Sequence, residues 1–249
     1  MRRTILALAT ALLTTLAGCS IYHPQTVDIP LINHAGDGRI DAAVGVSTFL
    51  LPDVVTFGGT VSYGFNDWLA GQAHLNYGGD NIYAQLAPGA YLPLGAKSVL
   101  EGYVGLGAGS AWRAPTQASS QPQTDTGSVH FNKYGYTGGF LLPFVQANIG
   151  WHDLTRAHID LALGLKGGAY CPDFRYEEFD DNGSHIPDND FFYRTTNMLF
   201  EPQLQFRIGG EKMKYCLRVS IVMLSNMSDG GGRFTYDYFT ISNGLTFKF

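Results

Sequence analysis

Residues 198–208 read MLFEPQLQFRI and alternate between apolar and polar side chains with a period of two. Successive side chains of a β-strand point to opposite faces, so this segment has one apolar face and one polar face. The polar face carries Glu201, Gln203, Gln205 and Arg207. Such a strand is predicted to lie between an apolar environment and a polar one.

The same alternation recurs along the chain from Arg39 onward, in segments separated by turn-forming residues. Ten segments have this pattern, namely 39–50, 54–64, 68–77, 82–92, 97–112, 134–151, 156–170, 197–208, 212–224 and 233–249. An even number of strands is the rule for single-chain bacterial barrels. The sequence therefore predicts an all-β fold, a closed antiparallel up-and-down barrel of about ten strands.

The lengths of the connections indicate which kind of barrel this is. Short connections follow the second, fourth, sixth and eighth segments, at 65–67, 93–96, 152–155 and 209–211. The long ones, 113–133 and 171–196, and the glycine-rich 226–232 all fall on the other side. Short periplasmic turns with longer outer loops are typical of transmembrane β-barrels, and both ends of the chain are then expected in the periplasm.

The polar faces carry charges of both signs that cannot face lipid, where Arg or Lys costs about 2–4 kcal/mol at the bilayer midplane. We expect these side chains to fill the lumen as a paired network that plugs it, formed by Asp41, Glu101, Asp160, Lys166, Glu201, Arg207 and Arg218. A soluble, lipocalin-like periplasmic carrier would instead turn its apolar faces inward. That alternative is the weaker one.

The N-terminus has the features of an export signal. Arg2 and Arg3 precede a mostly apolar run too short to span a bilayer, which ends in Leu16-Ala17-Gly18-Cys19. This end resembles the bacterial lipobox, in which the cysteine thiol receives a diacylglycerol and the cysteine becomes the new N-terminus. We therefore expect a signal peptide at 1–18, a lipidated Cys19 with a periplasmic tether at 19–38, and the barrel domain at 39–249.

Composition excludes some classes of partner. Charged residues make up 15% of the chain and the net charge is -5, with no cluster of Lys or Arg, which argues against nucleic acid. No apolar stretch after residue 19 approaches the length of a membrane helix. A bilayer would therefore have to be crossed by strands.

Several short sequences occur in an order that resembles small outer-membrane β-barrel lipoproteins of Gram-negative bacteria. They are Cys19, Tyr22-x-Pro24, Pro30-Leu31, Gly36-Asp37-Gly38, DAAVGVST at 41–48, EGYVGLGAG at 101–109 and the closing TFKF at 246–249. The resemblance implies an outer-membrane location, a lipid anchor on the periplasmic side and, from the terminal aromatic strand, recognition by the barrel-assembly machinery. Ser20 after the cysteine resembles lipoproteins sorted to the outer membrane. Members of this group mostly have no assigned activity, so the resemblance implies no catalytic residue.

The two long loops are where catalytic residues would be expected, because barrel enzymes place them at the outer rim. His130, and His185 with Asp188 or Asp190, are the candidates for acid–base work. The acidic stretch 176–190 also offers oxygen ligands for a divalent cation, although its spacing does not match an EF-hand. Hydrated loop charge is the favoured interpretation, and no motif predicts a cofactor or metal.

From these observations we expect a non-enzymatic outer-membrane barrel lipoprotein with a plugged polar lumen. Its partners are expected to be the lipid bilayer, the barrel-assembly machinery and a small ligand or protein at the outer loops. The alternative is a barrel enzyme that acts on lipid or peptide at the outer rim.

Overall fold

The structure of the chain is a computed structural model. It describes residues 21–47, 54–116, 123–125, 128–130, 133–180, 184–225 and 236–249. No helix within these ranges is long and apolar enough to cross a membrane. The predicted signal peptide and Cys19 lie outside the described residues.

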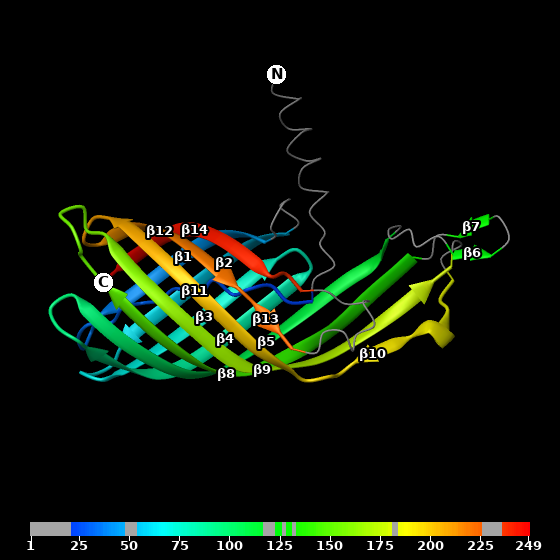
Figure 1. Cartoon of the computed structure of the whole chain (residues 1–249), viewed down its shortest axis with the longest axis horizontal. Coiled ribbons are helices and arrows are strands. Elements are labelled where there is room, and N and C mark those ends of the chain that lie inside the picture. The colour runs from blue at the N-terminus through cyan, green and yellow to red at the C-terminus, as the bar shows by residue number, and fades with distance from the viewer. Residues whose placement is uncertain are drawn as a thin grey trace, which may run out of the picture.

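Ten long strands form a closed antiparallel barrel (Figure 1), which confirms the predicted fold class. They are β1 (Gly38–Ser47), β2 (Val54–Gly64), β3 (Leu69–Gly78), β4 (Asn81–Pro93), β5 (Ser98–Thr116), β8 (Lys133–Trp151), β9 (Asp160–Phe179), β11 (Asn197–Gly209), β12 (Met213–Ile221) and β14 (Phe239–Lys248). Each pairs with the next in this order, and β14 pairs with β1 to close the ring. We call the end with the β2–β3, β4–β5, β8–β9 and β11–β12 connections the short-turn rim, and the opposite end the long-loop rim.

Several shorter elements lie at the long-loop rim. The strands β10 (Phe191–Tyr193) and β13 (Met223–Leu224) add to the edges of β9 and β11, and a 3-10 helix, η1 (Pro187–Asn189), precedes β10. The strands β6 (Gln123–Asp125) and β7 (Ser128–His130) form a separate hairpin. In Figure 1, β5, β8, β9 and β10 extend well beyond the other strands as an outer sheet.

The two faces of the barrel differ in polarity as a membrane barrel requires. Leu204 is 44% exposed on the outside and lies beside Leu163, which is 48% exposed. On the same strand, Gln205 and Arg207 point inward and are buried. An apolar exterior around a polar interior is the arrangement of a transmembrane β-barrel, and it is the reverse of a lipocalin. The lipocalin-like alternative is therefore wrong.

Strand limits differ from the expected ones mainly around β9. The strand begins at Asp160 rather than at 156, because Asp153 and His158 adopt positive φ angles of 50° in the preceding turn. It continues to Phe179, well into the stretch 171–196 that was expected to be a loop. Its outer part pairs with β8 as far as Lys133, so paired backbone hydrogen bonds extend the strand beyond the barrel. At the end of the chain, β14 begins at Phe239 rather than 233.

The largest correction concerns the stretch 19–38, which was expected to form a periplasmic tether outside the barrel and of which the structure describes residues 21–38. Residues 21–32 are all buried, and their backbone carbonyls and the Gln25 side chain accept hydrogen bonds from side chains that line the lumen. The apolar residues of this stretch, Ile21, Tyr22, Val27, Ile29, Leu31 and Ile32, would lose their burial in a solvated tether. The segment therefore packs inside the barrel, where Figure 1 shows it in blue.

The orientation of the faces predicts a depth-dependent cost of charge on the exterior. Replacing Leu204 near the middle of β11 by Arg should lower the free energy of unfolding in lipid vesicles by about 2–4 kcal/mol. The control Leu92→Arg, at the exposed end of β4 near the short-turn rim, should cost about 0–1 kcal/mol. Equal losses at the two positions in denaturant titrations would contradict a bilayer around β11.

Candidate functional site

The site is the lumen itself together with residues 21–32, which we call the lumen segment. Its contacts follow two facing strands in strict order. Along β11, the Tyr22 hydroxyl donates to Glu201 at 2.9 Å, Gln203 donates to the carbonyl of Val27 at 2.6 Å, and Gln205 donates to that of Ile29 at 2.8 Å. Because β11 runs from the long-loop rim to the short-turn rim, the lumen segment runs in the same direction.

The opposite wall gives the same order. Asn81, at the start of β4, donates to the carbonyl of Ile21 at 3.4 Å. On β3, Asn76 donates to the Gln25 side chain at 3.0 Å, and Gln72 donates to the carbonyl of Asp28 at 2.6 Å. Successive residues of the lumen segment thus meet positions that are progressively nearer to the short-turn rim. The segment is extended along the barrel rather than coiled at one end.

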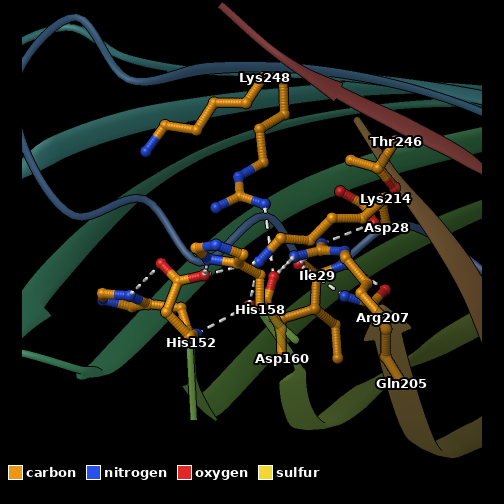
Figure 2. A network of polar contacts seen from close by, with 12 residues as sticks. Asp28, Ile29, His152, His158, Asp160, Gln205, Arg207, Lys214, Thr246 and Lys248 are labelled. Atoms are coloured by element: carbon orange, nitrogen blue, oxygen red, sulfur yellow. Dashed lines mark hydrogen bonds and ion pairs between the residues drawn. The ribbon is translucent and has the colours of Figure 1, made fainter. Parts of the chain in front are cut away.

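Asp28 pairs with two buried arginines, and Figure 2 shows it beside one of them, Arg207. Its Oδ1 accepts hydrogen bonds from Nη2 of Arg207 at 2.7 Å and from Nη2 of Arg218 at 2.8 Å. Both guanidinium groups are fully buried. The same Arg207 nitrogen also donates to the carbonyl of Ile29. One carboxylate of the lumen segment thus joins two buried cations from neighbouring strands β11 and β12.

The remaining acids of this cluster come from the barrel wall. Asp41 on β1 pairs with Arg218 and accepts a hydrogen bond from Thr246 at 3.0 Å. Asp160 lies 3.5 Å from Nη1 of Arg207 and 2.6 Å from Nζ of Lys214. Residues from β1, β9, β11, β12 and β14 are therefore joined through one ionic cluster that includes Asp28.

Asp153 extends the cluster into the turn between β8 and β9. Burial alone raises the pKa of Asp153, but hydrogen bonds from Lys214 and His158, both at 3.0 Å, outweigh it and lower the pKa to about 2. This carboxylate therefore stays charged across the neutral range. Its turn borders a polar cavity of about 580 Å³ at the short-turn rim, which Leu31 and Arg39 also line.

All seven residues expected in the lumen network point inward and are buried, but they do not form one network. Asp41, Asp160, Arg207 and Arg218 belong to the cluster around Asp28. Glu101 instead accepts from the backbone amide of Ile32 at 2.7 Å and from Asn148 at 3.1 Å. Glu201 accepts from Tyr22 and from Ser220, and Lys166 lies 5.1 Å from the centre of the Phe144 ring.

Aromatic side chains surround the end of the lumen segment that lies near the long-loop rim. The Tyr22 ring packs edge-on against Phe140 and Tyr170, with ring centres 5.6 and 5.3 Å apart. Tyr83 also stacks on Phe140, with ring centres 5.9 Å apart. Beyond this group, His23 pairs with Asp237, which precedes β14. The lumen segment is thus held by ion pairs at Asp28 in its middle and by aromatic packing at Tyr22 near the long-loop rim.

Sequence reasoning did not identify Asp28, Arg39 or Lys214 as members of the site. A signal for Asp28 was present, since this single charge stands between Val27 and Ile29 in a stretch too apolar for a hydrated tether. The lumen-facing position of Lys214 follows from the alternation of β12. Predicting which acid pairs with which base would require the registers of five strands.

The candidates for chemistry at the outer rim are only partly brought together. His185 and Asp190 lie 2.8 Å apart, but Arg175 also binds Asp190 at 2.7 Å, and the arginine and the histidine together lower the pKa of that carboxyl. Glu177 is close enough to share a cation with them, yet it also pairs with Arg175. His130 lies in β7, and its side chain is outside the described residues. Asp181 and Asn182 of the expected cation loop also lie outside them.

No protein-family model matches the chain, and no curated protein matches it. Several solved β-barrels are similar in outline. They include a NanC porin (11% identity over 84% of this chain and 100% of that one, TM-score 0.36) and the translocator domain of the autotransporter NalP from Neisseria meningitidis (13%, 87% and 90%, TM-score 0.37). A chain from the de novo design of transmembrane β-barrels is also similar (9%, 86% and 97%, TM-score 0.32). Likenesses this remote say nothing of function.

The cluster around Asp28 predicts a large effect of one substitution in the lumen segment. Asp28→Ala leaves Arg207 and Arg218 buried with one carboxylate fewer, and breaking a buried ion pair in this way costs about 3–5 kcal/mol. Equilibrium unfolding in detergent or vesicles measures the loss. The matched control Asp67→Ala, in the exposed β2–β3 turn, should change the free energy of unfolding by less than about 0.5 kcal/mol. A loss for Asp28→Ala no larger than that of the control would contradict a lumenal Asp28.

Proposed function

We propose that this chain is a non-enzymatic outer-membrane barrel lipoprotein whose lumen is closed by its own N-terminal segment. The barrel then serves as a scaffold that holds a binding surface on the outer side of the membrane. The observation that carries this proposal is the lumen segment, which occupies the space that a channel would need.

The size of the barrel supports closure. Barrels of about eight strands leave room only for side chains or one small ligand, and wide aqueous channels need about sixteen. In this ten-stranded barrel the additional interior space holds one extended chain, anchored by hydrogen bonds to β3, β11 and the arginines. The segment and the inward side chains together leave a polar vestibule at the short-turn rim, bordered by Leu31.

The outer sheet supports a binding role. Tyr134 stacks on Tyr176 at 5.4 Å between β8 and β9, and Arg113 of β5 lies 5.7 Å from the Tyr134 ring. Nearby, Arg194 lies over the exposed ring of Phe192 at 5.2 Å. Tyrosine, phenylalanine and arginine are enriched in protein interfaces, and long strands hold them more rigidly than loops would. We propose a ligand or protein partner for this surface.

Membrane placement follows from the same proposal. The apolar exterior takes the bilayer as its partner, the terminal strand β14 ends in aromatic residues suited to the barrel-assembly machinery, and Cys19 receives the lipid. The proposal includes no cofactor, and the pair of His185 with Asp190 is a structural ion pair of the outer loop.

Closure of the lumen is tested by conductance in planar bilayers. The purified protein should show no discrete channel steps. Asp28→Lys places a third cation between Arg207 and Arg218, so it should expel the lumen segment and produce channel steps. Folding of each sample is checked by its heat-modifiable migration on gels.

The control Asp67→Lys makes the same charge change in the exposed β2–β3 turn and should stay silent. Channel steps from the unmodified protein would contradict the proposal. So would a folded Asp28→Lys variant, or a folded variant lacking residues 21–32, that stays as silent as the control.

A further inference from the structure

The path of the lumen segment determines on which side of the barrel the chain before it emerges. Contacts at both ends of residues 21–37, which comprise the lumen segment and the residues that join it to β1, place this path. At the short-turn rim, Gly64 donates to the carbonyl of Asp37 at 2.9 Å, and Lys248 lies 2.9 Å from the carboxylate of the same residue. At the other end, Asn81 and Tyr170 both donate to the carbonyl of Ile21. Asn81 directly follows the β3–β4 turn at the long-loop rim.

The chain therefore crosses the whole lumen once before β1 begins. It enters beside the long-loop rim, passes Asp28 at the middle and leaves beside β2 and β14. Contacts at both walls keep the same order over the whole crossing, so the segment does not fold back inside the barrel.

The position of Ile21 limits where Cys19 can lie. Only Ser20 lies between Cys19 and Ile21, and an extended chain spans at most about 7 Å over these two steps along the backbone. The apolar band of a barrel of this kind is about 25 Å tall. With Ile21 held at the long-loop rim, Cys19 cannot return to the short-turn rim.

We propose that the lumen segment delivers the N-terminus to the outer face, so that the acyl chains on Cys19 insert into the outer leaflet of the outer membrane. The chain is then a surface lipoprotein that is anchored twice, by its barrel and by a lipid on the outer side. This replaces the expected lipid anchor on the periplasmic side. The inference rests on the proposed lipidation of Cys19 and on the long-loop rim facing outward.

Accessibility in intact cells tests the side on which the N-terminus emerges. An epitope inserted between Ser20 and Ile21 should bind antibody on intact cells, and so should a reference epitope inserted after Ser184 in the outer loop. The same epitope inserted between Asn66 and Asp67, in the β2–β3 turn, should bind only after the cells are permeabilised. An N-terminal epitope that behaves like the one in the β2–β3 turn would overturn the proposal.

A disulfide tests the crossing independently. A Cβ built at Gly164 on β9 would lie 3.5 Å from Cγ1 of Ile29, so Ile29→Cys with Gly164→Cys should cross-link in a background with Cys171 and Cys216 replaced by Ser. The control pair uses Gly102→Cys, because a Cβ at Gly102 meets nothing within 4 Å. Linked peptides found by mass spectrometry in the folded protein should come from the first pair alone. No link in the first pair would overturn the crossing.

Cys19→Ala, made behind a signal peptide that is cleaved without lipidation, distinguishes failure of the lipidation from failure of the crossing. The variant should lose the acyl mass while the N-terminal epitope stays accessible on intact cells, since the crossing does not depend on the lipid. Absence of the acyl mass from the protein that retains Cys19 would overturn the lipid anchor. The disulfide would then still report on the crossing.

Discussion

The structure depends on the need to give Arg207 and Arg218 acidic partners inside a closed sheet. Both arginines point away from the lipid because the opposite faces of β11 and β12 are apolar, and both are fully buried. A buried guanidinium without a carboxylate is among the most costly arrangements in a protein. The wall supplies Asp41 and Asp160, and Asp28 of the lumen segment binds both arginines. The buried arginines of the barrel wall thus favour a lumen segment that brings a carboxylate.

The amide side chains of the wall explain why the segment is extended. An extended backbone exposes its N–H and C=O groups, and each of these needs a partner when it is buried. Gln72, Gln203 and Gln205 provide such partners along the path. A coil or a helix would place these groups out of reach of side chains fixed on opposite strands. Barrel and segment therefore act as one folding unit.

Much of the fold could be predicted because a period of two is visible in a single strand. The apolar and polar faces of MLFEPQLQFRI require no knowledge of neighbouring strands, and the inward positions of Arg207 and Glu201 follow from them directly. The lumen segment could not be predicted in the same way. It has no alternation, and its partners, such as Gln72 and Gln205, lie 44 and 176 residues away. Only its apolar content distinguished it from a hydrated tether.

The most direct test of the account is hydrogen exchange at the backbone amides of the lumen segment in the folded protein. The amide of Ile29 donates to Gln205 at 2.9 Å and that of Ile32 donates to Glu101 at 2.7 Å, both within the closed barrel. Peptides that cover residues 25–32 should therefore exchange as slowly as the central part of β11. Exchange of these peptides at the rate of an unstructured chain, while β11 stays protected, would contradict a lumen closed by the N-terminal segment.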